Sequence, residues 1–282
     1  MPHDVRPARP EDVPGISEWT KDTFSWGDYV PESLSQWLTD PGLHVQVAVD
    51  ADDRPLAMAV VRMLSDDEGW LSAARVHPSA QRRGLGSLLN ASSVDWIKAQ
   101  GGRVARLAVE EDNAAARSQV EKLGYRRTST WVYGVIEGGE SPLQPVKGEQ
   151  IKVTGRSDVD PAWMYWSTSE MFDSGRGLKA SGWTWRRARV ADLHSFASDQ
   201  ALFSSPAGWV AIELAEDDQL DVVWVATSPN DFPRLIAGVD SLARDMSRAR
   251  VVYRLPQTGW SGEALRRVGA EVKETLVYAK AV

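Results

Sequence analysis

A short internal repeat constrains the architecture of this chain more than any other feature of its sequence. Residues 5–13, VRPARPEDV, align with residues 185–193, WRRARVADL, at a constant offset of 180 residues. Both segments read as a short strand followed by the start of a helix. After each of them the chain continues with strands, a longer helix, another strand, a short helix ending near glycine, and a last strand. Two similar units are therefore expected.

A stretch rich in glycine and proline separates the two halves. Residues 137–145, EGGESPLQP, are typical of a linker or a long loop. The length of 282 residues fits two domains, because a domain usually has about 150 residues. We expect a first domain over residues 1–140, a connector over 141–180 and a second domain over 181–282.

The composition is that of an ordinary globular protein, with 43% hydrophobic and 25% charged residues. No apolar run reaches the roughly 20 residues of a membrane span, and the first residues lack the apolar core of a secretory signal, so a cytoplasmic protein is expected. The net charge of −7 disfavours nucleic acid and anionic membranes as partners. The absence of cysteine excludes thiolate metal sites, and four scattered histidines indicate no metal site. We expect a monomer or homodimer without bound metal.

Hydrophobic periodicity predicts a mixed α/β first half. Helices are expected over residues 12–24, 33–38, 85–99 and 113–123, and strands over 43–49, 55–64, 70–76, 103–109 and 128–136. The first three of these strands are joined by short turns, which indicates an antiparallel meander. The repeat period changes from two to 3.6 after Pro78, where the chain leaves a strand, passes a glycine-containing loop and enters a helix.

This loop has the composition of a phosphate-binding turn. It consists of Gln81, Arg82, Arg83, Gly84, Leu85, Gly86 and Ser87. Free backbone N–H groups and the positive end of the following helix can receive an anion there. The two glycines allow a ligand to approach the backbone, and the two arginines add positive charge. A tight turn with exposed arginines is the alternative for the fragment taken alone.

The order of elements and two motifs resemble the GNAT superfamily of acyl-CoA N-acyltransferases. The signature Q/R-x-x-G-x-G/A of that family is matched by Gln81, Gly84 and Gly86. The segment 113–125, NAAARSQVEKLGY, is similar to a second family segment with an asparagine, small residues and an E-K-L-G-F/Y ending. The resemblance covers residues 4–136. It implies an α/β fold with a mostly antiparallel twisted sheet and a strand–loop–helix unit that holds acyl-CoA.

The resemblance also implies how acetyl-CoA, as co-substrate, is held. Its pyrophosphate would bind the backbone from Arg82 to Ser87, and its pantetheine arm would lie along Val76 where two strands separate. The remaining contacts would come from Asn113, Ala116 and Arg117. An amine would attack the thioester carbonyl directly in a ternary complex, and a backbone N–H near Val76 or His77 would meet the oxyanion.

The general acid and base are not obvious from the sequence. The tyrosine that protonates the thiolate in the family lies seven residues after the asparagine, where this chain has Val120. Tyr125 is a candidate replacement, although a packing role is favoured for its ring. The candidate bases are Glu110, Glu111, His77, Asp28 or a chain of water molecules. We assign Glu110, His77 and Tyr125 as the catalytic candidates.

Aromatic residues suggest where the acceptor binds. Trp26, Tyr29 and Trp37 fall in the region of the two early helices, which borders the acceptor pocket in the family that the chain resembles. They could hold an amine or an amino acid, although core packing is the commoner role of such rings. Trp163, Tyr165 and Trp166 in the connector could add cation–π contacts to the same wall.

The second half resembles a degenerate GNAT unit. Residues 221–229, DVVWVATSP, echo the strand that ends at Pro78, but residues 230–235, NDFPRL, replace the glycine-containing loop. Asp231 would repel phosphate, and Pro233 removes a backbone donor. The chain therefore resembles a tandem acetyltransferase in which only the first half keeps the coenzyme. The competing class is a non-catalytic acyl-CoA sensor or binding partner. Hydrolase, P-loop and zinc-protease motifs do not occur in the sequence.

Overall fold

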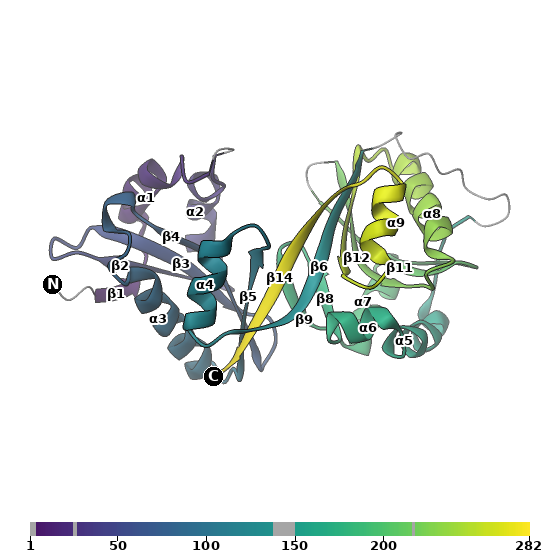
Figure 1. The fold of residues 1–282 in the computed structure, drawn as a ribbon, viewed down its shortest axis with the longest axis horizontal. Coiled ribbons are helices and arrows are strands. Elements are labelled where there is room, and N and C mark those ends of the chain that lie inside the picture. The colour runs from purple at the N-terminus through teal and green to yellow at the C-terminus, as the bar shows by residue number, and fades with distance from the viewer. Residues whose placement is uncertain (1–3, 25–26, 138–149, 216–217) are drawn as a thin grey trace. The chain divides into compact units, whose positions relative to one another are not determined.

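A computed structural model describes residues 4–24, 27–137, 150–215 and 218–282 (Figure 1). The chain forms two compact units. Unit 1 comprises Met1–Leu107, Ser118–Arg126 and Ala279–Val282, and unit 2 comprises Ala108–Arg117 and Arg127–Tyr278. Most of the expected linker, residues 138–145, lies outside the described residues. The domain boundaries at 140 and 180 therefore stay a prediction.

The first half folds into the elements that its periodicity predicts. They are β1 (Asp4–Pro7), α1 (Val13–Thr20), α2 (Val30–Thr39), β2 (His44–Val49), β3 (Pro55–Met63), β4 (Glu68–Val76), α3 (Leu85–Ala99), β5 (Val104–Glu110), α4 (Ala114–Lys122) and β6 (Arg126–Glu137). Strands β2, β3 and β4 form the predicted antiparallel meander, and β1 pairs antiparallel with β2. In the sheet, these strands are hydrogen-bonded neighbours in the order β1-β2-β3-β4-β5, and β5 is parallel to β4.

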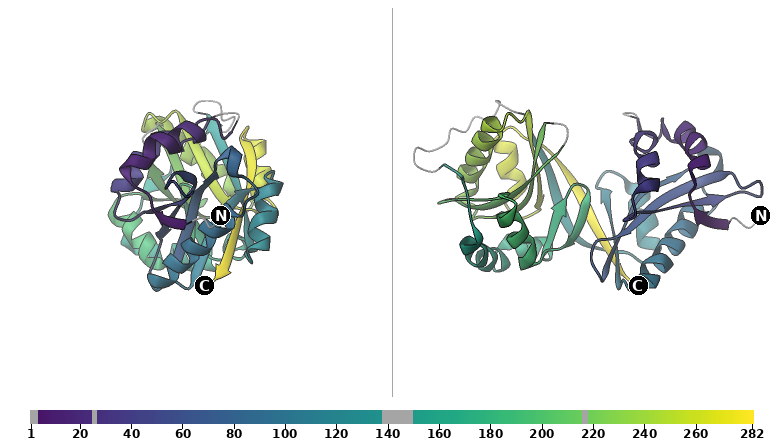
Figure 2. Two further views of the ribbon diagram at one scale, coloured as in Figure 1. Left: turned by 90° about the vertical axis from the view of Figure 1, so that its left-hand side faces the viewer. Right: turned by 180° about the vertical axis from the view of Figure 1, so that it is seen from behind.

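Helices cover both faces of the sheet in unit 1, as Figure 2 shows with α1 and α2 in purple and α3 in blue. The alternation in β2 explains this layering, since successive side chains of a strand point to opposite faces. Val45, Val47 and Val49 pack with residues of α1 and α2, whereas Ala48 packs with α3. Gln46, two residues before Ala48 on the same strand, is buried and donates from Nε2 to the Leu89 carbonyl of α3 at 3.0 Å. The sheet is thus buried on both sides.

The elements of the second half belong to unit 2, except for the last three residues of β14, which belong to unit 1. They are β7 (Lys152–Val153), α5 (Val159–Ser167), α6 (Glu170–Gly175), β8 (Leu178–Ser181), β9 (Thr184–Arg187), α7 (Val190–Ser198), β10 (Leu202–Ser205), β11 (Gly208–Leu214), β12 (Gln219–Ala226), α8 (Phe232–Asp245), β13 (Arg250–Pro256), α9 (Ser261–Arg267) and β14 (Glu271–Ala281). From β9 onward their order repeats β1-α1-β2-β3-β4-α3-β5-α4-β6 of the first half without α2. Strands β12 and β13 are parallel, as β4 and β5 are.

Strand β6, which we expected over residues 128–136 to close the first half, lies almost entirely in unit 2. It is antiparallel to β13, from Trp131 opposite Pro256 to Glu137 opposite Arg250. Val132 and Ile136 of β6 join the hydrophobic core of unit 2 together with Leu255. An alternating pattern of apolar residues marks a strand but does not identify the edge that the strand completes. The correction therefore concerns pairing and not secondary structure.

The internal repeat is visible as one recurring ion-pair motif. In unit 1 the two terminal nitrogens of Arg6 donate to the carboxylate of Asp12 at 2.7 and 2.9 Å, and the Arg9 N–H donates to the same carboxylate at 2.8 Å. In unit 2 Arg186 contacts both oxygens of Asp192, and the Arg189 N–H donates to Asp192 at 2.8 Å. Each motif ties a strand to the start of the next helix.

None of the helices in the described ranges is long and apolar enough to cross a membrane. Within the same ranges, no group of three or more His, Asp or Glu side chains is arranged to hold a metal ion.

Candidate coenzyme and acceptor site

The predicted phosphate loop turns sharply into α3 in unit 1. Gly84 is the N-cap residue and has a left-handed backbone with φ of +83°. Its carbonyl accepts the N–H groups of Ser87 at 3.1 Å and Leu88 at 3.0 Å. The N–H groups of Leu85 and Gly86, the first two of the helix, have no partner within the helix. A 15-residue helix thus presents two backbone donors at its positive end.

The side chains of the loop leave this helix end open to a ligand. A Cβ built on Gly84 would have no heavy atom within 4 Å, so space for a ligand exists there. Gln81, Arg82, Arg83 and Ser87 are exposed. No acidic side chain of the described residues forms an ion pair with Arg82 or Arg83. The buried side chain of Leu85 anchors the loop in the core below it.

Gly86 has less free space around it than Gly84. A Cβ at Gly86 would lie 2.5 Å from Nε2 of Gln119 on α4. Because Nε2 is the far end of a flexible side chain that can move away, this contact does not by itself require glycine at position 86. We expected both glycines to serve ligand approach; the surroundings of Gly84 leave room for a ligand, and the role of both glycines stays a prediction.

Strands β4 and β5 pair over only a short distance. Their parallel register joins Glu68 to Val104 and ends where Trp70 lies opposite Arg106. After Trp70, the described register pairs no further residue of β4 with β5. The ladder thus ends before Val76, where the resemblance to GNAT proteins implied that the strands separate, and the binding of pantetheine there stays a prediction.

Val76 and not His77 carries the backbone donor available at this separation. The His77 N–H donates to the Leu56 carbonyl of the neighbouring strand segment at 2.8 Å. Because successive N–H groups of an extended strand point in opposite directions, the Val76 N–H points away from β3. Of the two expected oxyanion donors, we therefore keep Val76.

The His77 side chain stabilises a turn. Its Nδ1 accepts the N–H of Ser79 at 3.1 Å and lies 2.9 Å from the Ser79 hydroxyl, which caps the 3-10 turn Pro78–Ala80. The ring also contacts Trp19, with 5.7 Å between ring centroids. With Nδ1 occupied, Nε2 is the nitrogen left for proton transfer, and the catalytic role of His77 stays a prediction.

Tyr125 lies in the interior of unit 1. It is 2% exposed, and its hydroxyl accepts a hydrogen bond from Nδ2 of Asn90 at 3.1 Å. Burial raises the pKa of Tyr125, although the bond from Asn90 opposes this. The phenol therefore keeps its proton at neutral pH. This burial favours a packing role, and a role of Tyr125 as the acid replacing Val120 stays a prediction.

The candidates at the end of β5 and the start of α4 belong to unit 2. Glu110 and Glu111 are exposed, and the Glu110 carbonyl accepts the Asn113 N–H at 3.1 Å. Asn113 caps α4 as predicted, since its Oδ1 accepts the Ala116 N–H at 3.0 Å. Arg117 donates to the Glu111 carbonyl at 2.7 Å. The roles of these residues in catalysis and coenzyme binding stay predictions.

Aromatic residues near α2 surround an ion pair that we did not predict from the sequence. Arg75 of β4 donates to both carboxylate oxygens of Asp28, at 2.6 and 3.1 Å. The Arg75 guanidinium lies 4.8 Å from the ring centroid of Phe24 and 5.4 Å from that of Tyr29. Tyr29 in turn meets Trp37 edge-on at 5.8 Å. Trp26 lies outside the described residues. An arginine within an apolar strand was the signal for this pair.

Asp28 is unsuited to the role of base that the sequence left open. Its side chain is fully buried in the pair with Arg75. Burial alone would raise the pKa of Asp28, but the hydrogen bonds from Arg75 and from the Val30 N–H outweigh it and hold the pKa below its ordinary value. A carboxylate stabilised in this way is a weak proton acceptor.

The equivalent helix start in unit 2 has its backbone donors occupied. The N–H groups of Asp231 and Phe232 both donate to the Ser228 carbonyl, at 3.2 and 3.0 Å. Pro233 has no N–H, and the next two N–H groups donate to the Asp231 carbonyl at 3.0 Å. The Asp231 carboxylate pairs with Arg234 at 2.8 Å. This helix start lacks the free donors found at Leu85 and Gly86.

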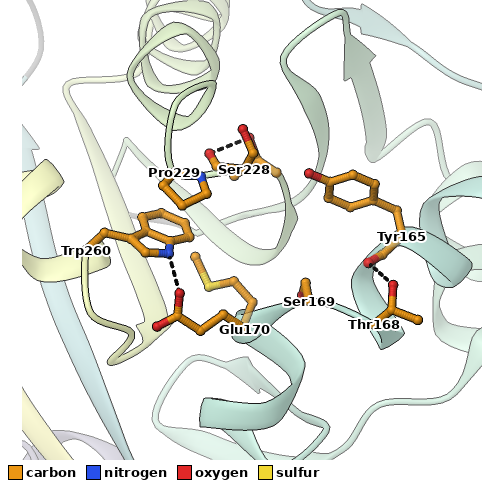
Figure 3. A pocket seen from close by; sticks show the side chains of 9 residues that line it. Tyr165, Thr168, Ser169, Glu170, Ser228, Pro229 and Trp260 are labelled. Carbon is orange, nitrogen blue, oxygen red and sulfur yellow. Dashed lines mark hydrogen bonds between the residues drawn. The ribbon is translucent and has the colours of Figure 1, made fainter.

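The connector aromatics pack within unit 2. Trp166 is 3% exposed and contacts Trp163 and Trp224, with ring centroids 5.2 and 5.6 Å apart. Tyr165 is 41% exposed and lines a pocket of unit 2, drawn in Figure 3. Trp166 is thus a core residue of unit 2. A contribution of Trp163 and Tyr165 to acceptor binding stays a prediction.

Comparison with known proteins bears on the first half of the chain. The sequence model described as "Acetyltransferase (GNAT) family" matches residues 13–125. A GNAT acetyltransferase segment therefore occupies these residues. It contains β2 to β5, the loop before α3, and α4.

Curated relatives carry acetyltransferase names. A mycothiol acetyltransferase from Gordonia bronchialis is 31% identical over 124 residues, which are 43% of this chain and 40% of that protein. A ribosomal protein bS18-alanine N-acetyltransferase from Salmonella typhimurium is 33% identical over 86 residues, which are 30% of this chain and 57% of that protein. The match thus covers less than two thirds of either relative.

A solved structure extends the likeness of fold beyond the GNAT segment. A GCN5-related N-acetyltransferase from Sphaerobacter thermophilus has a TM-score of 0.67 and 17% sequence identity, and the match covers 99% of this chain and 95% of that one. At this identity the likeness concerns the fold alone. The mixed α/β fold of both halves therefore has a counterpart of similar length among GNAT structures.

Proposed function

We propose that this chain is an acetyl-CoA-dependent N-acetyltransferase with one coenzyme site, formed around residues 81–87 of unit 1. The observation that carries the proposal is the start of α3, where no described residue accepts the Leu85 and Gly86 N–H groups and Gly84 is open to approach. Two exposed arginines, Arg82 and Arg83, add charge that suits a pyrophosphate. The GNAT segment over 13–125 supports the same reading.

The transfer step is proposed to be a direct attack of an amine on the thioester within a ternary complex. Acetyl-CoA supplies the activated acetyl group, and the Val76 N–H is the candidate donor to its carbonyl oxygen. Positioning of two bound reactants can lower a barrier by roughly 7–11 kcal/mol, so the lack of an obvious acid at Val120 need not abolish activity. Glu110 and His77 remain the candidate bases.

The acceptor is proposed to be the amine of a small molecule, for example an amino acid. The relatives are named for different acceptors, mycothiol in one case and the alanine of a ribosomal protein in the other. Support for a small amine comes from the exposed Tyr29 and from the charge pair of Arg75 and Asp28 on the α1–α2 side of the sheet. Tyr29 is the group open to an acceptor there, and the buried, mutually paired Asp28 and Arg75 position its ring through the cation–π contact of Arg75.

The second half is proposed to be a degenerate GNAT-like domain. Three observations support it: the recurring ion-pair motif at Arg186 and Asp192, the repeated order of elements, and the parallel pair β12 and β13 flanking α8. The occupied donors around Asp231 argue against a second coenzyme site there. The proposed domains are residues 1–140 and 181–282, joined by the connector 141–180.

A screen for free CoA release tests the function. The full chain is incubated with acetyl-CoA and a library of amines, amino acids and N-terminal peptides, and new thiol is measured. Acceptor-dependent release is expected for at least one small amine. If the chain binds acetyl-CoA but no acceptor releases CoA, the sensor function replaces the enzyme. If only peptides release CoA, the small-molecule acceptor is wrong.

A further inference from the structure

Unit 2 contains a pocket of about 300 Å³ beside the end of β12 (Figure 3). Thr227, Ser228 and Pro229 follow β12 as His77 and Pro78 follow β4. The pocket therefore lies at the place in the repeat where unit 1 has the turn that leads to its phosphate loop. Ligand pockets usually have about 300–1,000 Å³, so this one suits a small ligand.

The charge of this pocket is the reverse of that of the phosphate loop. Glu170 is the one charged residue among the nine that line the pocket. In unit 1 the loop carries Arg82 and Arg83 instead. A phosphate or carboxylate would be repelled by Glu170, and the donors at the start of α8 are already occupied by Ser228 and Asp231. The pocket therefore disfavours anions and favours a cation.

The Glu170 carboxylate is held in place by two neutral donors. Its Oε1 accepts the Gly259 N–H at 2.8 Å. Its Oε2 accepts Nε1–H of Trp260 at 2.9 Å, the bond drawn in Figure 3. Each oxygen keeps a further acceptor position. No basic side chain of the described residues forms an ion pair with Glu170. The pocket thus presents a fixed, partly exposed negative charge without a counter-charge from the protein.

Aromatic rings and hydroxyl groups complete the lining. Trp260 and Tyr165 lie at opposite sides of the pocket, with Ser228 between them at one edge and Ser169 at the other (Figure 3). Trp260 packs edge-on against Phe232 at 5.2 Å, so its ring has little freedom. Aromatic faces attract cations, and a carboxylate strengthens hydrogen bonds from an N⁺–H donor. Together these groups have the chemistry of an ammonium site.

We propose that this pocket is a second ligand site that binds a small organic ammonium ion. Glu170 provides the counter-charge, and Trp260 and Tyr165 provide aromatic walls. The Ser169 and Ser228 hydroxyls each already accept one backbone N–H and keep one acceptor position for an N–H donor of the ligand. The site is formed by residues of unit 2 alone. It does not depend on the proposed acetyl transfer, because binding is measured without acetyl-CoA.

The indole signal of Trp260 reports on the site directly. In a ¹⁵N-labelled full chain, the Nε1–H resonance of Trp260 is assigned by its loss in Trp260→Phe. Butylammonium should shift this resonance with a dissociation constant of about 1 mM. Butanol, which has a similar size but no charge, should shift it far less, and inorganic pyrophosphate should not shift it. Equal shifts from butanol and butylammonium, or no shift from butylammonium, would overturn the proposal.

Two glutamate variants separate charge at the pocket from charge elsewhere in unit 2. Glu170→Gln keeps the shape and should weaken butylammonium binding at least about tenfold. Glu263→Gln, on α9 and paired with the exposed Arg267, should leave it unchanged. Equal affinities of Glu170→Gln and the wild type would rule out the site. If Glu170→Gln does not fold, as judged by thermal unfolding, the wild-type comparison of butylammonium with butanol decides alone.

Choline extends the comparison to a quaternary ammonium. It carries the charge but has no N⁺–H donor, so it should bind more weakly than butylammonium if the serine hydroxyls and Glu170 accept hydrogen bonds. Tighter binding of choline would contradict the assigned role of the hydroxyl groups.

Discussion

Arg186 donates from two nitrogens to the carboxylate of Asp192 in unit 2, in the arrangement that joins Arg6 to Asp12 in unit 1. In both places the backbone N–H three residues before the aspartate donates to the same carboxylate at 2.8 Å. The shared offset in sequence thus corresponds to a shared local structure. The two ion pairs share a local structure but differ in exposure, so comparing them tests how much burial adds to the stability that an ion pair provides.

We predict that Asp12→Asn destabilises the protein more than Asp192→Asn. The Arg6 and Asp12 side chains are 14% and 7% exposed, whereas those of Arg186 and Asp192 are 26% and 13% exposed. Removing a partner from hydrogen-bonded charges should lower the free energy of unfolding by about 2 kcal/mol at Asp12. Chemical denaturation measures both. Asp53→Asn is the control, since Asp53 pairs with the same Arg6 but is 54% exposed and should have a small effect.

The ion pair of Arg6 and Asp12 should also make the stability of the protein depend on pH. Burial alone would raise the pKa of Asp12, but hydrogen bonds from Arg6 and the Arg9 N–H outweigh it and lower the pKa. A lowered folded-state pKa means that the stabilisation is present above the ordinary aspartate pKa and is lost as the pH falls through the folded-state value. Denaturation between neutral pH and about pH 3 should therefore show a weaker acid dependence in Asp12→Asn than in the wild type. Parallel curves would contradict this assignment.

Gly84→Val should abolish acetyl-CoA binding while the protein stays folded. The left-handed φ of +83° disfavours a branched residue, and the added side chain would occupy the open space beside the backbone. Gly101→Val is the matched control, because Gly101 has φ of +87° and equally open surroundings but follows the other end of α3. Both should lose about 1–3 kcal/mol of stability.

Calorimetric titration distinguishes the two glycine variants. Gly101→Val should bind acetyl-CoA like the wild type, whereas Gly84→Val should not bind. Unchanged affinity in folded Gly84→Val would remove the loop from the proposed site. Loss of binding in both would show that strain anywhere along α3 is sufficient.

Tyr125→Phe should keep most of the activity. The buried hydroxyl accepts from Asn90, so its loss should lower stability by about 0.5–1.5 kcal/mol. If the hydroxyl protonates the thiolate, turnover should instead fall about 10²–10⁴-fold. Asn90→Ala removes the same hydrogen bond from the other side. A large fall in turnover in Tyr125→Phe alone, at equal stability of the two variants, would identify Tyr125 as the acid.

The sequence predicted local structure well because local signals determine it. Pro78 and Gly84 mark the turn into α3, and Asn113 caps α4, and each effect acts over a few residues. The partner of β6 could not be predicted in this way, since pairing with β13 depends on residues more than a hundred positions away. The same holds for the Arg75 and Asp28 pair, which joins β4 to the segment before α2.

The candidate site likewise combines features set by local sequence with features set by long-range packing. The turn into α3 was predictable because two glycines and two arginines precede a helix start, where free N–H groups favour an anion, and phosphate binding there stays a prediction. Which backbone N–H is free was not predictable, because it depends on strand register: His77 bonds Leu56, and Val76 faces the other way. The closeness of the Gln119 side chain to Gly86 likewise depends on where α4 lies and could not be predicted.

Acetyl transfer should follow sequential kinetics without a covalent acyl-enzyme. The chain has no cysteine, and its sequence has no recognisable activated serine to carry an acetyl group between substrates. Initial rates with acetyl-CoA and an active acceptor should give intersecting double-reciprocal lines. A ping-pong pattern, or an acetyl adduct in the intact mass after incubation with acetyl-CoA alone, would contradict direct transfer.

Each chain should bind one acetyl-CoA, although the strand–helix–strand unit occurs twice. At the start of α3 the N–H groups of Leu85 and Gly86 are free, whereas at the start of α8 the donors of Asp231 and Phe232 are held by Ser228. A second pyrophosphate would have to break these backbone bonds and compete with the Asp231 carboxylate for Arg234, which already pairs with it at 2.8 Å.

Equilibrium dialysis at saturating acetyl-CoA should therefore give one molecule per chain, and Gly84→Val should reduce this to none. Asp231→Asn, which removes the opposing charge at α8 without touching the loop of α3, should leave the stoichiometry at one, because the occupied backbone donors remain. Two molecules per wild-type chain would overturn the division between the halves. One molecule bound to folded Gly84→Val would locate the coenzyme outside the loop before α3.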